Sequence, residues 1–527
     1  MVSPMILIAL PLATAFLIVL IGSRVAARWL ALAAVALLVG LAPFWFADIL
    51  RNGPMSIVLA DVLPPLGIAF GLDALSAGFV LLIAVSGLLV LLYSVPYIPH
   101  AGQFEGAKKA ETRYYALFLL LMAGSFGLVM TKDIFNLFVF FEILCISSYI
   151  LVAYSQEERS LEAGIKYMIL GSIGSAFMLV AIGLSYRVAG SLAMNDIGLA
   201  LAAAPHGYAL LVAVLFTLGF GIEAAIFPLN TWLPDAHSSA PSSISAVLSG
   251  FVIEVALVVL VRIGISVFGT LMEPALGVLA LAGVVVGELA ALGQKELKRT
   301  LAFSSIGQVS IMLFAFSLGT QSGDWAGLGQ LLMHTGAKSA LFLVSGYFIL
   351  RTGSHEIESY RGLARRMPAA AAFFSLAALS LVGMPPFFGF FTKFRIIEVA
   401  AAARSALGYA GIVVILFGTV IEAVYLFRIV RVLYGGAIEG ARSDALVGIE
   451  AAAGADGATP FADGATQGAL ANAAGSPASA ATPTRADLPA LAWIAVAGFV
   501  ALVLVGGFAF PWFDQALQPI AAALATL

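Results

Sequence analysis

The sequence predicts an all-α polytopic membrane protein with about fourteen transmembrane helices. Of its 527 residues, 61% are hydrophobic and only 10% are charged, whereas soluble domains average about 25% charged residues. The mean hydropathy is +1.05, and the apolar residues gather in stretches of about 20 residues, the length that one crossing requires. Because backbone polar groups in lipid must bond within their own segment, these stretches are expected to be helices.

The fourteen predicted spans follow one another with short loops between them. They cover residues 4–22, 27–47, 70–94, 113–131, 133–154, 164–187, 207–233, 242–269, 275–293, 300–319, 326–350, 368–400, 407–434 and 488–512. The predicted organisation is three N-terminal helices in 1–112, a first half-channel in 113–269 (spans 4–8), a second half-channel in 275–434 (spans 9–13), a linker in 436–486 and a C-terminal helix in 488–527. Residues 436–486 are rich in Ala, Gly, Thr, Ser and Asp, a composition typical of a flexible linker.

The distribution of lysine and arginine predicts the orientation. Loops on one side carry eighteen of these residues and loops on the other side carry four. Loops rich in lysine and arginine stay in the cytoplasm, so the first loop and the linker are expected there and both termini outside. The apolar N-terminus lacks a basic region before it, so we interpret it as the first span rather than a removed signal. We expect a multi-pass protein of the cell inner (cytoplasmic) membrane, surrounded by lipids.

Composition excludes several other classes. The net charge of −3, without a basic cluster, gives no indication of a nucleic-acid partner. The one cysteine, Cys145, excludes an intrachain disulfide and a cysteine-based metal site, and the five histidines lack the spacing of metal ligands. No phosphate-binding loop, nucleophile elbow or haem-type histidine pair is present. We therefore expect no cofactor, no metal and no catalytic centre in the chain itself.

Two spans contain helix breakers at related places. Span 7 has Gly219, Gly221, Pro228 and Pro234, and span 12 has Gly383, Pro385, Pro386 and Gly389. Proline interrupts a helix, and broken backbone inside lipid is tolerated where it lines a cavity or lies within protein. The breaks lie five spans apart, and each has an ionisable residue nearby. This pattern predicts two inverted five-helix repeats, spans 4–8 and 9–13.

The buried charges are the main functional signal. A charge at membrane depth costs roughly 2.5 kcal/mol or more and usually marks an ion path or a specific partner. Glu142 has no basic neighbour in its segment, and His334 and Lys338 share one helix face because they are four residues apart. The candidates for a proton or cation path are Glu142, Glu223, Glu254, His334, Lys338 and Lys393.

Three further residues are candidates for the path or its gating. Glu422 lies deep in span 13 and is placed to neutralise Lys393 or Arg395. Arg395 and Glu398 approach the outer side, where they are expected to pair. His237 lies in the loop between spans 7 and 8.

Four blocks of sequence resemble the antiporter-like proton-translocating subunits. This family includes the N, M and L subunits of complex I, the D-type and A-type subunits of Mrp-type Na⁺/H⁺ antiporters, and subunits of membrane-bound hydrogenases. The resemblance covers spans 3 to 13. Its blocks are 221–237 (GIEAAIFPLNTWLPDAH) with 240–241 and 245–250, then 294–306 (QKELKRTLAFSSI), 334–342 (HTGAKSALF) and 383–393 (GMPPFFGFFTK).

The resemblance implies roles for several residues and also a departure. Glu142 corresponds to the family's span-5 glutamate, and Lys338 and Lys393 correspond to its span-11 and span-12 lysines. The family usually has lysine at the position of Glu223 and lysine or histidine at that of Glu254. The first half therefore lacks the glutamate–lysine pair that the family uses to move protons, and many members have histidine where residue 308 is glutamine.

The resemblance also implies a function with alternatives. We expect an ion-translocating membrane subunit of a multisubunit cation/proton antiporter of Mrp type, with other membrane subunits as partners. In the first half, carboxyls alone could conduct H⁺, or Glu142, Glu223 and Glu254 could bind Na⁺, or this half could be a scaffold. The alternatives for the whole chain are a proton-pumping arm of a complex I-like or hydrogenase-type oxidoreductase, and a structural subunit.

Overall fold

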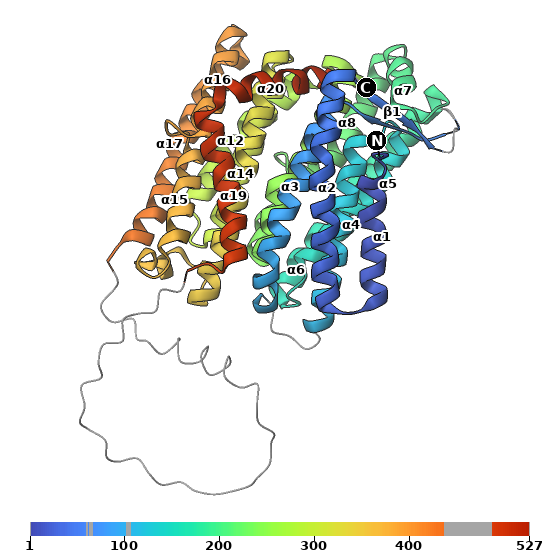
Figure 1. The fold of residues 1–527 in the computed structure, drawn as a ribbon. Helices are drawn as coiled ribbons and strands as arrows, with labels where there is room; N and C mark the ends of the chain where they lie inside the picture. The colour runs from blue at the N-terminus through green and yellow to red at the C-terminus, as the bar shows by residue number, and fades with distance from the viewer. Residues whose placement is uncertain (1, 60–61, 63–66, 102–106, 437–486, 526–527) are drawn as a thin grey trace, which may run out of the picture.

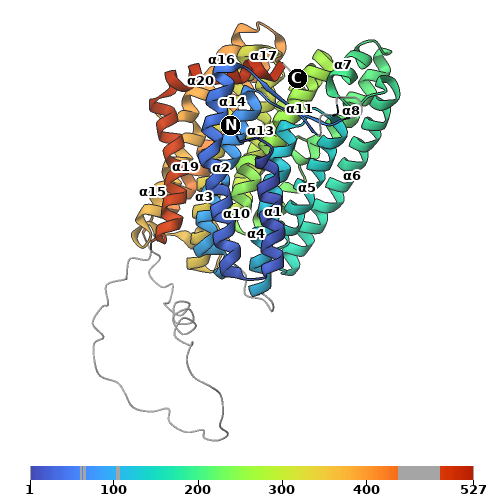
Figure 2. The ribbon, with the colours of Figure 1, turned by 45° about the vertical axis from the view of Figure 1, so that its right-hand side comes forward.

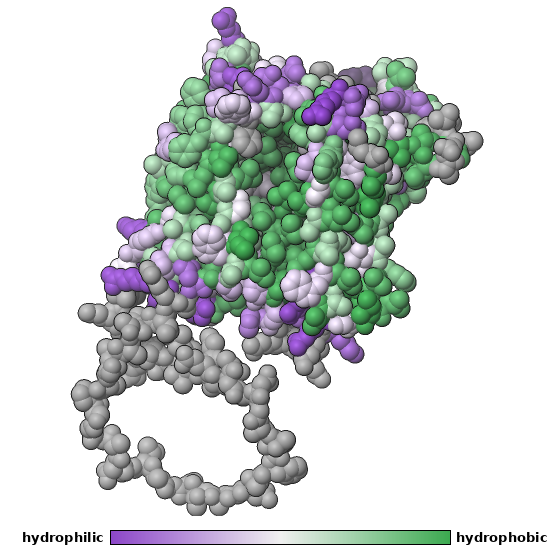
Figure 3. Space-filling model, viewed as in Figure 1, coloured by the Kyte–Doolittle hydropathy of each residue, from purple (hydrophilic) through white to green (hydrophobic). Residues whose placement is uncertain are grey.

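The computed structural model describes residues 2–59, 62, 67–101, 107–436 and 487–525, which form a bundle of long helices (Figure 1). On the face shown in Figure 3, hydrophobic side chains form a broad band, and hydrophilic residues gather at the two ends of the bundle. Among the described residues, eleven helices are long and apolar enough to cross a membrane. This arrangement is that of a multi-pass membrane protein.

The long helices run along the bundle between its two ends (Figure 1). They are α1 (Ile6–Ile21), α2 (Arg24–Asn52), α3 (Ala74–Tyr97), α4 (Ala107–Met130), α5 (Ile134–Val152), α6 (Glu158–Ala189), α8 (His206–Glu223), α11 (Ile253–Phe268), α12 (Glu273–Leu292), α13 (Leu297–Phe316), α14 (Gln321–Thr352), α15 (Pro368–Val382), α16 (Phe388–Ala402), α17 (Ala406–Tyr434) and α19 (Ala490–Phe508). Shorter elements are α7 (Met194–Ala202), α9 (Leu233–Ser239), α10 (Ser242–Val247), α20 (Phe510–Ala522) and the antiparallel strands β1 (Met55–Val58) and β2 (Ala69–Leu72).

Every predicted span contains a helix, with ends shifted by a few residues. Three predicted spans lie outside the eleven that meet the length and composition test: α1, α14 and the pair α15–α16. The chain is mostly helical, as predicted, and its described residues also include a two-stranded sheet of β1 and β2. Helices α7 and α20 were also not predicted. The predicted linker lies outside the described residues apart from Gly436.

The two ends of the bundle differ in the elements that they carry. We call one the hairpin end, which carries β1, β2, α7 and α20 (Figure 1). We call the other the basic end, where α6, α13 and α15 begin (Figure 1). Arg159 and Arg299 lie in the first turns of α6 and α13, and Arg361 and Arg366 lie in the segment before α15.

At the hairpin end, Asp73 links three segments. Its Oδ1 accepts a hydrogen bond from the Ser76 backbone N–H at 2.9 Å, which caps α3. Its Oδ2 lies 3.3 Å from Lys132 Nζ and also pairs with Arg262 of α11. Burial opposes ionisation of Asp73, but Arg262 and Lys132 hold the pKa of this carboxyl below its usual range. Burial, together with the charge of Arg262, lowers the pKa of Lys132 to about 8.

Both predicted helix interruptions are present. In span 7, α8 ends at Glu223 and α9 begins at Leu233. The indole N–H of Trp232 donates to the Ile222 carbonyl at 2.8 Å, in the last turn of α8. In span 12, α15 ends at Val382 and α16 begins at Phe388. Helix ends leave carbonyls without intrahelical partners, so each break exposes acceptors inside the bundle.

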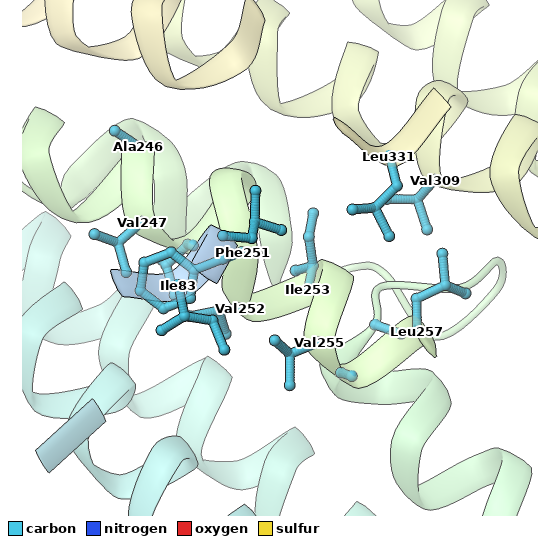
Figure 4. Packing of buried hydrophobic residues seen from close by; sticks show 14 of the residues in the cluster. Ile83, Ala246, Val247, Phe251, Val252, Ile253, Val255, Leu257, Val309 and Leu331 are labelled. Carbon is cyan, nitrogen blue, oxygen red and sulfur yellow. The ribbon is translucent and has the colours of Figure 1, made fainter. Parts of the chain in front are cut away.

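Span 8 is the buried centre of the fold. It comprises α10, a π-helical turn at Leu248–Val252 and α11. Figure 4 shows its residues Phe251 and Val252 beside Ile83 of α3, with Val309 and Leu331 of α13 and α14 close to each other. A Cβ on Gly250 would lie 2.3 Å from the Ser339 hydroxyl, so glycine allows α14 to approach. Single π-helical turns occur often at functional sites.

The last long helix closes the bundle. Helix α19 packs against α3, α14, α15 and α16, and Figure 2 shows it next to α15 and α3. Before α19, the Asp487 carboxylate accepts hydrogen bonds from the backbone N–H groups of Ala369 and Ala370 at 2.9 and 3.3 Å. These residues lie in the first turn of α15, where backbone N–H groups lack intrahelical partners. The C-terminal segment therefore connects the first helices of the chain to the second half.

Candidate ion path

Lys393 and Glu422 form a buried ion pair at the break of span 12. Lys393 Nζ lies 2.6 Å from Glu422 Oε2, and both side chains are almost fully buried. The same ammonium donates to the carbonyls of Leu381 and Val382, at 2.7 and 3.4 Å. These carbonyls belong to the last turn of α15, which carries the negative end of the helix dipole. Of the two partners expected for Glu422, the structure pairs it with Lys393.

A chain of amides continues from this pair. Gln308 Nε2 donates to Glu422 Oε1 at 2.8 Å, and Gln330 Nε2 donates to Gln308 Oε1 at 2.6 Å. The Thr392 hydroxyl donates to Gln330 Oε1 at 2.6 Å. All of these groups are buried. Buried polar groups are stable only when hydrogen-bonded, and this network fixes the position of the Glu422 carboxylate.

Lys338 lies in the middle of α14 and is fully buried. Its Nζ donates to the Leu301 carbonyl of α13 at 2.8 Å, and it interacts electrostatically with Glu422 and Glu288. Glu288 of α12 is 1% exposed, and its Oε2 accepts a hydrogen bond from Tyr425 at 2.8 Å.

Glu254 and His334 meet at the centre of the molecule. His334 Nδ1 lies 2.8 Å from Glu254 Oε1, and both side chains are fully buried. The Thr335 hydroxyl donates to Glu254 Oε2. The structure therefore joins two residues from different predicted halves, because Glu254 is in α11 and His334 is in α14. A carboxyl bound to an imidazole can exchange a proton along one hydrogen bond.

Glu223 has neutral partners. Its Oε1 accepts a hydrogen bond from the Tyr167 hydroxyl at 2.5 Å, and its Oε2 lies 3.4 Å from the Cys145 thiol. Glu142 accepts a hydrogen bond from Ser175 and interacts electrostatically with Glu223. Within the described ranges, neither carboxylate has a basic side chain at ion-pair distance.

The remaining candidates lie at different places. His237 is buried in α9, with its ring stacked on Phe342 at a centroid distance of 4.7 Å. Neither of its ring nitrogens has a hydrogen-bond partner among the residues that the structure describes. Arg395 pairs with Glu398 at 2.6 Å and stacks over Trp325. The expected Arg395–Glu398 pair is therefore present, and it is partly exposed and apart from the Lys393–Glu422 pair.

The three carboxylates considered for Na⁺ bind different partners. Glu223 bonds to α5 and α6, Glu254 to α14, and Glu142 to α6. Among the described residues, no group of three His, Cys, Asp or Glu side chains could hold a metal ion. That part of the structure therefore contains no preformed three-carboxylate Na⁺ site.

Sequence reasoning missed several members of this network. Gln330 lies four residues before His334 and eight before Lys338, so the helical spacing that linked those two residues also pointed to it. Tyr167 and Tyr425 gave no such signal. Hydroxyls on apolar helices are common, and their carboxylate partners are 56 and 137 residues away in sequence.

A family match and two curated relatives point to the same family of membrane subunits. Residues 131–421 match the family described as NADH:quinone oxidoreductase/Mrp antiporter, TM. NADH-quinone oxidoreductase subunit N of Desulforudis audaxviator is 32% identical over 82% of this chain and 86% of its own length. The D-type subunit of the Na⁺/H⁺ antiporter of Bacillus subtilis is 30% identical over 74% of this chain and 79% of its own length.

A solved structure extends the similarity to the fold. A chain of the membrane-bound sulfane sulfur reductase, an archaeal respiratory membrane complex, superposes with a TM-score of 0.82 at 30% identity. The match covers 98% of this chain and 97% of that one. The resemblance seen in four short blocks therefore extends over nearly the whole chain.

Proposed function

This chain belongs to the transmembrane family of the NADH:quinone oxidoreductases and Mrp antiporters, and on that premise we propose that it translocates protons as a membrane subunit of a multisubunit complex. Its relatives are named as subunits of an oxidoreductase and of an antiporter. The chain is accordingly an antiporter-like membrane subunit of Mrp or complex I type. The proposed partners are other membrane subunits of that complex.

One observation carries the proposal for the second half. Four ionisable groups, Lys338, Glu288, Glu422 and Lys393, are buried and interact with one another inside the bundle. Buried charges are costly and are retained in membrane proteins mainly on ion and proton paths. Their interaction supports a path on which a proton that binds Lys338 changes the electrostatic energy of Lys393 and Glu422.

The Glu254–His334 pair supplies the proposed link between the halves. Its members can donate and accept protons, and Glu254 belongs to the first predicted half and His334 to the second. His334 also interacts electrostatically with Lys338, four residues away on α14. A proton on this pair therefore changes the energy of a proton on Lys338.

We infer that the first half uses carboxyls in place of the family's lysine. Glu223 has a tyrosine and a cysteine as donors rather than a cation, so proton binding leaves this group of side chains without net charge. A purely structural first half is the alternative, and the Glu223 variant below separates the two. Na⁺ transport is a further outcome of the same assay.

The proposed topology has fourteen crossings in two inverted five-helix repeats, with both termini outside the cytoplasm. The broken spans α8–α9 and α15–α16 and the concentration of lysine and arginine at the basic end support it. The basic end then faces the cytoplasm and the hairpin end faces outward.

We propose a cation/proton antiporter of Mrp type as the complex. A pumping arm of a respiratory oxidoreductase is the second candidate, favoured by the similarity to subunit N over 82% of the chain. Purification of the complex in mild detergent separates them. Co-purifying redox subunits indicate the oxidoreductase, whereas small membrane subunits without redox centres indicate the antiporter.

The transport test uses inverted vesicles that contain the whole complex. Lys338→Met is expected to lower proton transport at least about tenfold, since it removes the central titratable group. The exposed Lys295, replaced by Met, is the control and should leave transport unchanged. Wild-type transport by Lys338→Met would contradict the second-half path, and wild-type ΔpH and Na⁺ flux in Glu223→Gln would contradict an ionic role for that residue.

A further inference from the structure

Lys298 is a buried cation that the path described above does not use. The predicted spans leave Lys298 in the loop between residues 293 and 300. In the structure it lies in the first turn of α13, and its side chain is 3% exposed. Its Nζ donates to the carbonyl of Ala240, the C-cap residue just after α9. No carboxylate of the described residues lies within ion-pair distance of this ammonium. A buried ammonium with one carbonyl acceptor is costly, so its position requires an explanation.

His237 lies one helical turn from the Ala240 carbonyl. It lies within α9, three residues before this C-cap residue. Its ring stacks on Phe342 of α14, which follows Lys338 by four residues, or about one turn. The imidazole therefore lies between a helix end that holds Lys298 and a helix face that holds Lys338. It interacts electrostatically with both lysines.

The two lysines are held at neighbouring levels of α13. Lys298 is in that helix, and Lys338 Nζ donates to the carbonyl of Leu301, three residues further along. Three residues rise about 4.5 Å along a helix. The backbone of Lys298 and the carbonyl that binds Lys338 therefore lie within one turn of α13, and His237 interacts electrostatically with both lysines.

The unsatisfied polar atoms indicate water at this place. Both ring nitrogens of His237 and the hydroxyl of Ser239 lack hydrogen-bond partners among the described residues, although all three atoms are buried. Buried polar atoms almost always have partners, and ordered water supplies them where protein does not. Lys298 also has two N–H groups beyond the one that Ala240 accepts.

The basic end gives this group access to solvent. Glu296, two residues before Lys298, pairs with Arg159 at 2.6 Å, and both side chains are partly exposed. Lys298 interacts electrostatically with both. Bulk water thus reaches the segment that carries the buried lysine.

From these contacts we propose that Lys298 and His237 form the proton-uptake site of the chain at its basic end. The inference rests on the proposed function. Lys298 releases a proton from Nζ to a bridging water, and the water passes a proton to one ring nitrogen of His237. The other ring nitrogen releases its proton to neutral Lys338. Lys298 then takes a new proton from the basic end, and the histidine returns to its first tautomer.

Two variants separate proton uptake from a purely structural role. Lys298→Gln and Lys298→Arg both keep an N–H donor for the Ala240 carbonyl, but neither exchanges protons as lysine does. Assembled complexes with either variant are expected to lose proton transport about 10²-fold. Lys295→Gln, three residues away and exposed, is the matched control and should transport normally. Normal transport by the Lys298 variants would overturn the proposal.

If both variants fail to assemble, a measurement on the wild-type complex tests whether water reaches His237 at the proposed uptake site. Hydroxyl-radical labelling modifies side chains that touch water, so His237 should be labelled faster than the buried Phe118 of α4. Equal labelling of the two would overturn the proposal.

The Lys338→Met variant, assayed in parallel, separates the two hypotheses. If it stops transport while the Lys298 variants transport normally, only the uptake site is wrong. If Lys338→Met itself transports normally, the proposed second-half path is wrong.

Discussion

Replacing Glu422 with Gln leaves the Lys393 ammonium buried without its carboxylate partner. The pair is held at 2.6 Å inside the bundle, where solvent screening is weak. Replacing Lys393 with Met leaves the opposite charge buried. The double variant removes both charges, so the four proteins form a thermodynamic cycle that isolates the interaction.

The structure sets the size of the expected coupling. Charge centres about 4 Å apart at an effective dielectric constant of 20 attract by about 4 kcal/mol. The charge that remains in each single variant keeps some stabilising partners. In Glu422→Gln the carbonyls of Leu381 and Val382 still accept from Lys393, and in Lys393→Met Gln308 still donates to Glu422. We expect a coupling energy of about 3 kcal/mol, with each single variant less stable than the double variant.

Equilibrium unfolding of the complex in mixed micelles, read by pulse proteolysis of this chain, measures the cycle. Arg395 and Glu398 on the same helix α16 are the control, because their pair is partly exposed, at 35% and 53% of the side chains. That pair should couple by at most about 1 kcal/mol. A coupling for Lys393–Glu422 no larger than the control would refute the reasoning.

Three further outcomes are expected. Gly250→Ala should destabilise the complex by about 1–3 kcal/mol because its Cβ meets a hydroxyl of α14, whereas Gly264→Ala, with nothing within 4 Å of the added atom, should not. Tyr167→Phe removes the 2.5 Å donor of a buried carboxylate and should cost about 1–3 kcal/mol in pulse proteolysis; a loss under about 0.5 kcal/mol would contradict this. The lowered pKa of Asp73 stabilises the fold fully above about pH 4 and ceases to do so as pH falls through that lowered pKa. The midpoint temperature of thermal unfolding should therefore fall in acid, and Asp73→Asn, which abolishes the charge pairing with Arg262, should remove that pH dependence.

The long helices and the two interruptions were predictable because they depend on local sequence. A run of about 20 apolar residues and a cluster of Gly and Pro each act over one helix. The strands β1 and β2 were missed because each has four residues, too few to show a period. The short helices α7 and α20 were missed for a similar reason, since neither adds a long apolar stretch.

The side-chain partners were predictable only in part. Spacing within a helix placed His334 with Lys338, and depth in the membrane placed Glu422 near Lys393. The pairing of Glu254 with His334 joins residues 80 apart, and the burial of Lys298 depends on where α9 ends. Both depend on how distant helices pack, which a single sequence does not encode locally.

The two helix breaks differ in how their carbonyl contacts depend on protonation. At the end of α15 the free carbonyls are bound by the ammonium of Lys393, whose number of N–H groups changes when a proton leaves. At the end of α8 the carbonyl of Ile222 is bound by the indole of Trp232, which does not titrate. The bonds that the α15 carbonyls accept therefore depend on the charge of Lys393, whereas the bond that Trp232 donates to Ile222 does not. Of these two carbonyl contacts, the one after α15 comes from a titratable donor.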